Sequence, residues 1–368
     1  MKLKALELKN FRVYKHLEYS CHPRLNIILG DNAQGKTSIL ESIHMLGITK
    51  SHKTLRDVEV IQSECEHAKI RGSLLLEDTP LELDVVISKN GKKAKYNRIE
   101  IKKLSEYVGY LNVVMFAPED LDLIKGSPSE RRRFMDLEIG KLKKSYITYL
   151  IQYRRILKER NEVLKGIQQK KKYNHTILEI LTEQLIHYGE KIIQARIEFI
   201  EMLNDIVQEK YLNISGESIT VNLTYTPSIK DNLKEAYAKR QRQDILFGNT
   251  QNGPHRDDFE ITFEGIPIKT YASQGQIRSM VLAIKLAIVE MIYKEKAQYP
   301  IVLLDDVFSE LDSSRQINLL DHLNPETQLF ITTTDLNSIP MDKLSSYQIT
   351  TISQGQIKGV IHDAKPKL

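Results

Sequence analysis

The residues best suited to chemistry form a short glycine-containing segment near the start of the chain. Residues 30–37 read GDNAQGKT and match the pattern Gly-x4-Gly-Lys-Ser/Thr without a mismatch. Glycines let such a loop bend so that backbone N–H groups face phosphate oxygens. The lysine supplies a cation for the β- and γ-phosphates, and the threonine hydroxyl can bind Mg²⁺. A predicted strand at 25–29 and a predicted helix at 37–47 flank the segment. The sequence therefore predicts a phosphate-binding loop.

A second candidate is a strand that ends in two carboxylates. Residues 301–304 are apolar, and Asp305 and Asp306 follow directly. In open α/β folds ligands bind at the carboxyl edge of the sheet, where such a strand delivers its acids. Asp305 suits a Mg²⁺ ligand, directly or through water, and Asp306 could polarise an attacking water. Two aspartates after a strand also occur in ordinary turns, but the phosphate-binding loop favours the catalytic interpretation.

Two shorter segments are best interpreted together with the phosphate-binding loop and the two carboxylates. Residues 272–276 (ASQGQ) precede an amphipathic helix, whose serine, glycine and free N–H groups can bind an anion. One nucleotide does not need two complete phosphate sites, so this segment makes sense if it faces a nucleotide held by a second subunit. Residues 309–312 (SELD) follow shortly after Asp306. The alternative for both segments is an ordinary helix cap.

Basic residues gather in two parts of the chain, whose net charge is +5. Residues 141–173 hold eleven Lys or Arg, which suits a polyanion such as DNA, a docking protein, or simply a solvated helix surface. No helix-turn-helix, zinc module or aromatic platform is evident, so we expect phosphate contacts without base readout and an affinity that falls with salt. The first candidates for DNA contact are Lys92, Lys93, Lys95, Arg98, Lys102 and Lys103.

Length and composition exclude several classes of protein. The 368 residues are 41% hydrophobic and 27% charged, which indicates a folded chain of two domains, or one domain with a large insertion. Cys21 and Cys65 lack the spacing of a metal site and are too few for a disulfide scaffold, so we expect a cytoplasmic protein. The apolar stretch 280–289 is interrupted by Lys285 and is too short to span a membrane.

The elements that must position these groups alternate between strand and helix at both ends of the chain. Strands are predicted at 2–9, 25–29, 68–76, 81–88, 112–116, 218–225, 259–263, 301–307 and 329–334, and helices at 37–47, 277–293 and 313–323. Between them, capping boxes at Ser127 with Glu130 and at Thr176 with Glu179 begin two long helices, separated by a turn at 166–174. The first is predicted to end near 165, and the second has an apolar stripe at 177, 181, 185, 188, 192, 195, 199, 202 and 206. The pattern predicts one α/β domain, 1–117 with 245–368, split by a mainly helical insertion at 118–244.

The order of the four segments resembles the ABC-type ATPases, in which they are the Walker A, signature, Walker B and D-loop motifs. Within that class the chain is similar to proteins with SMC-type heads, and more narrowly to the RecF family of bacterial recombination mediators. The stretches that carry this resemblance are 10–12 (NFR), 51–54 (SHKT), 116–121 (FAPEDL), 125–134 (KGSPSERRRF), 153–155 (YRR), 253–258 (GPHRDD) and 332–335 (TTTD).

The resemblance implies a P-loop ATPase head, lobe I, with an inserted helical lobe II and no long coiled coil. It implies that ATP is sandwiched between two subunits of an ATP-dependent homodimer, with Ser273, Gly275 and Gln276 reaching the partner's nucleotide. Asp305 and Thr37 would serve Mg²⁺, Asp306 and Lys36 would be catalytic, and Ser309 and Asp312 would belong to the D-loop. The implied ATP-binding residues are Arg12, Gly30, Asp31, Asn32, Ala33, Gln34, Gly35, Lys36, Thr37 and Ser38.

The same resemblance implies a weak, DNA-stimulated ATPase that binds duplex or gapped DNA, is associated with the nucleoid, and acts with RecR and RecO to direct RecA onto gapped DNA at stalled forks. Two departures from the broad ABC pattern predict slow turnover. Asp306 stands where glutamate is usual, and Thr333 or Thr334 stands where a switch histidine is usual. Pro118 and Glu119 occupy roughly the Q-loop stretch, and no glutamine can be assigned there.

Three other functions compete with this one. A transporter's nucleotide-binding subunit would have a shorter insertion between Lys36 and Ser273 and a surface that docks on a membrane. A P-loop kinase would leave the ASQGQ and SELD segments without a role. A purely structural DNA-bridging protein would not need the Mg²⁺ and carboxylate positions.

Overall fold

The computed structural model describes residues 1–368 except 55, 78, 170–174, 231, 345 and 363–368. The described residues separate into two units. Unit 1 holds Met1–Asp120, Glu209–Glu217 and Arg278–Leu368, and unit 2 holds Leu121–Gln208 and Ser218–Ile277.

This division differs from the predicted boundaries in three places. Residues 245–277, assigned from sequence to the ATPase lobe, lie in unit 2, whereas residues 118–120 and Glu209–Glu217, assigned to the helical lobe, lie in unit 1. Strand β9 (Val221–Thr226) pairs along its length with β10 (Asp258–Phe263), which holds the first of these segments in unit 2. Local sequence patterns do not reveal which distant strand a strand will pair with. The function of each unit as a lobe stays a prediction.

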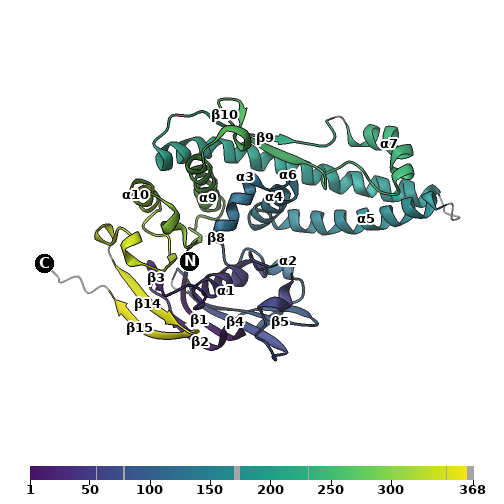
Figure 1. Cartoon of the computed structure of the whole chain (residues 1–368). Coiled ribbons are helices and arrows are strands. Elements are labelled where there is room, and N and C mark those ends of the chain that lie inside the picture. The colour runs from purple at the N-terminus through teal and green to yellow at the C-terminus, as the bar shows by residue number, and fades with distance from the viewer. Residues whose placement is uncertain (55, 78, 170–174, 231, 345, 363–368) are drawn as a thin grey trace. The chain divides into compact units, whose positions relative to one another are not determined.

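Unit 1 contains two six-stranded sheets (Figure 1). The first is antiparallel, with the order β2-β1-β4-β5-β6-β7. Its strands are β1 (Lys2–Phe11), β2 (Tyr14–Ser20), β4 (His67–Leu76), β5 (Thr79–Ser88), β6 (Gly91–Tyr96) and β7 (Ile99–Ile101). The second has the order β15-β14-β3-β13-β12-β8 and is parallel except for β15. Its strands are β3 (Leu25–Leu29), β8 (Val113–Phe116), β12 (Ile301–Asp305), β13 (Leu329–Thr333), β14 (Tyr347–Ser353) and β15 (Gln356–His362).

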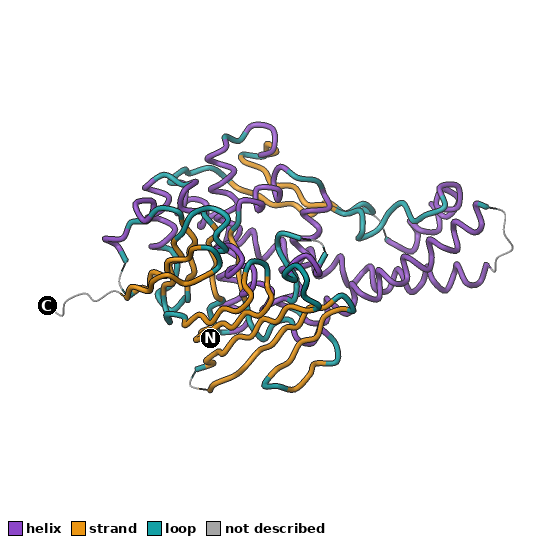
Figure 2. The backbone as a smooth tube through the Cα atoms, turned by 60° about the horizontal axis from the view of Figure 1, so that its bottom comes forward, coloured by secondary structure: helices purple, strands orange, loops and turns teal. Residues whose placement is uncertain are grey.

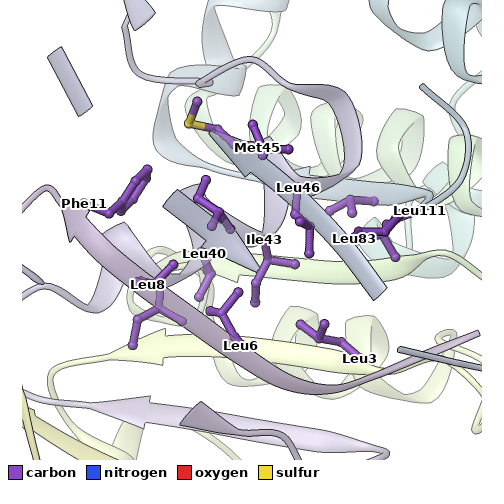
Figure 3. Close-up of a cluster of buried hydrophobic side chains, with 14 of the residues drawn as sticks. Leu3, Leu6, Leu8, Phe11, Leu40, Ile43, Met45, Leu46, Leu83 and Leu111 are labelled. Carbon is purple, nitrogen blue, oxygen red and sulfur yellow. The ribbon is translucent and has the colours of Figure 1, made fainter. Parts of the chain in front are cut away.

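Helix α1 (Lys36–Ile48) contacts strands of both sheets and forms the centre of the unit's core. The spacing of its apolar residues places Ile39, Leu40, Ile43 and Leu46 on one face of this helix, and these side chains are completely buried. Figure 3 shows side chains of this helix among those of β1, which are also inaccessible to solvent. Burial at this level stabilises the fold by about 1.5–3 kcal/mol for each large apolar side chain.

The remaining elements of unit 1 are short, apart from the greater part of α9 (Gln274–Lys296). They are η1 (Asp57–Val60), α2 (Leu104–Tyr107), η2 (Pro118–Leu121), η3 (Val307–Glu310), α10 (Ser313–Asp321), η4 (Leu336–Ser338) and η5 (Met341–Lys343). Because β3 and β12 are parallel to their common neighbour β13, the ends of β3 and β12 meet at one edge of the sheet. The predicted phosphate-binding loop and the pair Asp305 and Asp306 both lie at that edge.

Unit 2 is mainly helical. Its elements are α3 (Asp122–Lys125), α4 (Pro128–Leu142), α5 (Lys144–Gln168), the greater part of α6 (His175–Ser215), α7 (Leu233–Phe247), α8 (Ile268–Tyr271), and a small antiparallel sheet of β9, β10 and β11 (Ile266–Pro267). Helices α5 and α6, which belong to the two long helices predicted from sequence, lie side by side in both views (Figures 1 and 2).

Several local expectations for unit 2 need correction. The first long helix is interrupted at Lys143, whose extended backbone separates α4 from α5. Ser127 is the N-cap of α4 with proline at the next position, but its hydroxyl contacts Ser129 and makes no capping bond, so the predicted capping box does not form. The described part of α6 begins at His175, which places Thr176 within the helix. Residues 170–174 of the predicted turn lie outside the described residues.

The apolar stripe of α6 is rotated slightly from the prediction. Ile177 and Met202 are exposed, whereas their neighbours Leu178 and Leu203 are completely buried. The helix also buries Arg196, which a stripe of apolar residues does not predict. Periodicity locates such a helix well and its exact buried face less well, because the packing partners decide the face.

Candidate nucleotide-binding site

The predicted phosphate-binding loop connects β3 to α1. Its last residue before the helix, Gly35, has φ +109°, a conformation that favours glycine, and an added Cβ would lie 2.7 Å from the Tyr14 hydroxyl oxygen. An added Cβ at Gly30 would collide with the carbonyl oxygen of Ile352. The Tyr14 hydroxyl donates a hydrogen bond of 3.1 Å to the Gly35 carbonyl oxygen. Both glycines are therefore required by close packing, and Gly35 is required by its backbone conformation as well.

The rest of the loop lies open to solvent and is braced from one side. Ala33 has φ +62°, and Asp31, Asn32 and Ala33 are exposed. The Gln34 carbonyl accepts a bond of 3.1 Å from the Gly355 backbone N–H. Gly355 lies in the turn between β14 and β15, strands that the sequence patterns did not predict.

Lys36 lies folded over this loop. Its Nζ donates to the carbonyl oxygens of Gly30, at 2.5 Å, and Asp31, at 2.8 Å. Burial lowers the pKa of Lys36, while Asp306 and Asp305 act in the opposite direction. Among the described residues, this buried cation donates hydrogen bonds to carbonyl oxygens alone, so it is well prepared to exchange them for the oxygens of an anion.

Thr37 and Asp305 meet at the sheet edge, although 268 residues separate them. The Thr37 hydroxyl Oγ1 donates a hydrogen bond of 2.8 Å to Asp305 Oδ1, which also accepts from Thr332 Oγ1 at 2.8 Å. Asp305 is buried, and its other oxygen lies 3.6 Å from Lys53 Nζ. The predicted Mg²⁺ ligands are thus adjacent, and a hydroxyl and a cation hold the carboxylate in place.

Asp306 follows with a strained backbone. Its φ of +53° is uncommon for a residue with a side chain, and its N–H donates to Thr332 Oγ1 at 3.0 Å. Oxygen Oδ1 is buried and has no hydrogen-bond partner among the described residues. A carboxylate oxygen without a partner, beside the predicted phosphate-binding loop, is a natural acceptor for a water proton.

Arg12, predicted to contact phosphate, is held by protein groups. Its Nε and Nη2 donate to Glu41 Oε2 and Oε1 at 2.8 and 2.6 Å, and its Nη1 donates to the Glu59 carbonyl at 2.9 Å. The Arg12 bonds and the Ser51 hydroxyl lower the pKa of Glu41 against the effect of burial. The bond of 2.5 Å from Ser51 Oγ to Glu41 fixes the start of the segment that carries Lys53.

The predicted signature loop belongs to unit 2. Ser273 Oγ accepts from the Gln276 backbone N–H at 3.2 Å, and Gln276 Oε1 accepts from the Ser273 N–H at 2.9 Å, which is a reciprocal cap of α9. Ser273 is exposed and Gly275 is half-buried. The helix-cap alternative is therefore realised in this structure, and it leaves the serine side of the cap accessible to a partner.

The predicted D-loop residues also have local roles. Asp312 is the N-cap of α10, where it accepts from the Arg315 N–H at 2.9 Å, and the pKa of Asp312 is lowered chiefly by that bond. Ser309 Oγ donates to the Asp306 carbonyl at 2.7 Å. Ser309 therefore ties this segment to the residue predicted to be catalytic. Ser38, the last predicted nucleotide contact, lies half-buried in the first turn of α1.

Three of the six residues predicted first for DNA contact face acidic partners. Lys92 pairs with Asp57 at 2.8 Å and is only 10% exposed, Lys93 pairs with Glu100 at 3.2 Å, and Arg98 Nε lies 3.8 Å from Glu82. The other three, on β6 or in the segment before α2, are Lys95, Lys102 and Lys103. The structure does not gather these six residues into one uncompensated surface.

A nucleotide with Mg²⁺ fits the residues at this edge. Mg²⁺ retains several waters and takes one or two protein oxygens beside those of phosphates. Thr37 Oγ1 and Asp305 are two such oxygens. The described residues hold no cluster of three His, Cys, Asp or Glu that would bind a metal without a nucleotide. Among the same residues, no helix is both long and apolar enough to cross a membrane.

Sequence reasoning missed three contributors to this site. Thr332 bonds both Asp305 and Asp306, whereas Thr333 and Thr334 were singled out. Lys53 and Glu41 were not assigned roles. The half-buried His52 lies beside Lys53, and neither of its buried ring nitrogens is bonded to a described residue. Burial lowers the pKa of His52. The stretch SHKT was noticeable in the sequence, but only the fold brings it to Asp305.

Comparisons with known proteins agree over nearly the whole chain. The family described as RecF/RecN/SMC N terminal domain matches residues 2–358. The DNA replication and repair protein RecF of Staphylococcus carnosus (strain TM300) is 44% identical over 368 residues, which cover 97% of this chain and all of that protein. The same protein of Staphylococcus aureus (strain JH9) is 42% identical with the same coverage.

Solved structures give the same result for the fold. A structure of the recombination mediator protein RecF with ATP, in the RecFOR pathway, matches with a TM-score of 0.89 and 32% identity, covering 99% of this chain and 98% of that one. An SMC head bound to the C-terminal winged-helix domain of ScpA matches with a TM-score of 0.56 and 16% identity, and covers 99% of each chain. The second likeness concerns the fold alone.

Proposed function

Because the chain belongs to the RecF family of bacterial DNA replication and repair proteins, we propose that it is an ATP-dependent, DNA-binding switch of recombinational repair. Its fold is that of an ABC-type ATPase with an SMC-like head. The observation that carries the proposal is the 2.8 Å bond between Thr37 Oγ1 and Asp305 Oδ1, which joins a phosphate-binding loop to a buried carboxylate. A phosphate-binding loop with such a carboxylate beside it is typical of an ATP-binding site.

Binding rests on the loop backbone, Lys36 and the first turn of α1. Bound ATP with Mg²⁺ supplies the bond to be hydrolysed and the charge that the site must neutralise. Lys36 would leave the carbonyl oxygens of Gly30 and Asp31 for the phosphates, and this exchange favours its charged form. Thr37 and Asp305 would hold Mg²⁺, while the strand β12 keeps the carboxylate in place.

Hydrolysis is proposed to be weak, stimulated by DNA, and suited to a switch. Asp306 would orient the attacking water through Oδ1, which has no hydrogen-bond partner in the described part of the chain. Its side chain is one methylene shorter than that of the glutamate usual in ABC-type ATPases, so the carboxylate reaches less far. A shorter reach at this position supports slow turnover, because the base must lie within hydrogen-bond distance of the water.

Dimerisation is proposed to complete the site in trans. Ser273, Gly275 and Gln276 would contact ATP held by a second copy, and Ser309 and Asp312 would lie near them as the D-loop. The exposure of Ser273 at a helix start supports this role, since an N-terminal turn offers N–H groups and a partial positive charge to phosphate.

The partners follow from the family. We propose that the dimer binds duplex or gapped DNA without base readout, acts with RecR and RecO in the bacterial cytoplasm at the nucleoid, and so directs RecA to stalled forks. A structure of a relative in the RecFOR pathway supports this assignment. No membrane partner is proposed.

Sedimentation velocity tests the trans site. We expect a monomer without nucleotide or with ADP and a dimer with ATP and Mg²⁺. Ser273→Arg should abolish the dimer while ATP binding is retained, because the new guanidinium occupies the space for the partner's phosphate. Ser218→Arg, at another exposed serine of unit 2, is the matched control and should dimerise normally.

A monomer under all conditions, with ATP still bound, would contradict the switch and favour a kinase-like function. A dimer that persists in Ser273→Arg would contradict the role of the signature loop.

A further inference from the structure

Arg132 and Arg256 belong to the arginines of unit 2 that, among the described residues, have no carboxylate partner. Arg132, on α4, donates from Nη1 to the Asp257 carbonyl at 2.8 Å. Arg256 lies in the GPHRDD stretch and is exposed. Among the described residues, neither guanidinium forms an ion pair. Each guanidinium has five N–H donors, so most of theirs are open.

The carboxylates around them are already engaged. Asp258 receives Nε and Nη2 of Arg131 at 2.7 and 2.8 Å. Asp257 accepts from the Ser228 N–H at 2.6 Å and from the Tyr225 hydroxyl. These bonds fix the acids in place and leave them little capacity to neutralise a further arginine.

Asp136 is engaged in the same way. Its Oδ1 accepts from Tyr146 Oη at 2.6 Å and from Arg196 Nη2 at 2.9 Å, and its Oδ2 accepts from Arg154 Nη2 at 2.9 Å. Arg196 is buried and contributes a further positive charge beneath the surface.

The charge at Arg132 is therefore poorly compensated. Burial lowers the pKa of Arg132, and Arg196 and Arg256 lower it further, whereas Asp258 and Asp136 act in the opposite direction. Like charges held together at a surface repel one another and lower the stability of the folded protein. A bound anion reduces this repulsion.

Buried groups fix the turn that presents Arg256. Gly253 has φ +131°, and an added Cβ there would lie 2.7 Å from the Tyr153 hydroxyl oxygen. His255 points inward, with Nδ1 bonded to Tyr153 Oη at 2.8 Å and Nε2 to the Thr250 carbonyl at 3.1 Å. The Arg256 N–H closes the turn onto the Gly253 carbonyl at 2.7 Å. An inward histidine leaves the next residue, Arg256, facing solvent.

From this arrangement we propose that Arg132 and Arg256 form a phosphate-binding site for the backbone of duplex DNA. Guanidinium groups with free donors bind phosphate oxygens in pairs, and such contacts position a duplex without reading its sequence. The proposal rests on the proposed function only in taking DNA as the polyanion. It gives a role to the segments RRRF and GPHRDD, which the nucleotide site does not use.

The site also lies close to the signature loop within unit 2. Arg131, bound to Asp258, donates from Nη1 to the Gly126 carbonyl at 3.1 Å. The neighbouring Lys125 bonds to Gln274 at the start of α9. A phosphate at Arg132 would therefore be linked through a short series of contacts to the loop proposed to meet the partner's nucleotide.

Fluorescence anisotropy with duplexes of two unrelated sequences, titrated in salt with ATP and Mg²⁺, tests this site. Arg256→Gln should weaken binding about 8-fold at 0.1 M salt and reduce the slope of log K against log salt by about 1, equally for both sequences. Arg242→Gln removes the same charge from an exposed arginine of α7 and should change neither quantity. Arg132→Gln should act like Arg256→Gln, with circular dichroism as a check of folding.

The outcomes distinguish a failure of the proposed site from a failure of the proposed function. If the unmodified protein binds no DNA, the proposed function fails. If it binds DNA and Arg256→Gln leaves the affinity and the salt slope unchanged, the site assignment fails, and an acidic protein becomes the alternative ligand. If Arg256→Gln lowers ATP-driven dimerisation but not DNA binding, the phosphates are those of the nucleotide, and the proposal is overturned.

Discussion

His255 makes the stability of unit 2 sensitive to acid. The Thr250 carbonyl can only accept, so Nε2 of His255 carries the proton and Nδ1 accepts from the Tyr153 hydroxyl. This neutral ring is buried, and burial lowers the pKa of His255 to about 4 from its ordinary value of 6.5. The unfolded chain therefore binds a proton between pH 6.5 and 4 that the folded chain does not.

The free energy of unfolding must fall as pH is lowered through this range. Stability from the neutral ring is fully present above pH 6.5 and is lost progressively toward pH 4, to a total of about 3 kcal/mol. Between pH 7 and 4.5 the loss should be roughly 2 kcal/mol. Replacement by glutamine keeps one acceptor and one donor but removes the titration.

We expect His255→Gln to be less stable than the unmodified protein at pH 7, and the difference to shrink by roughly 2 kcal/mol by pH 4.5. Urea unfolding followed by circular dichroism measures this, and an NMR titration of the histidine ring measures the pKa directly. His187→Gln, at an exposed histidine of α6, is the matched control. A titration of His255 above pH 6, or a stability difference independent of pH, would refute the reasoning.

Two further substitutions test packing at other places. Gly35→Ala should abolish ATP binding in calorimetry while the chain stays folded, because the added methyl meets the Tyr14 hydroxyl and the backbone is left-handed there; retained binding would contradict the tight loop. Arg160→Met leaves Asp244 buried and unpaired and should lower the unfolding free energy by about 3–5 kcal/mol. A double variant with Asp244→Leu should recover part of the loss, and no recovery would show that the cost lies elsewhere.

Local elements of unit 1 were predictable because their signals are local. The loop 30–37, the buried face of α1 and the strand before Asp305 each follow from spacing, apolar periodicity and glycine. Strands β14 and β15 were missed because their alternation is weak, with exposed and polar residues on β15. The break at Lys143 was missed because nothing in the composition around it disfavours a helix.

The sequence by itself determined the family of this protein and predicted its chemistry, from a glycine-containing loop with the pattern of a phosphate-binding loop and from a strand that ends in acids. Tertiary structure alone decided which groups meet. Residues far apart in the chain meet in the contact of Thr37 with Asp305 and in the pairing of Arg12 with Glu41. The poorly compensated charge of Arg132 and Arg256 likewise depends on residues that are distant in the chain. Motifs encode backbone geometry over a few residues, whereas charge compensation depends on every carboxylate that the fold brings within reach.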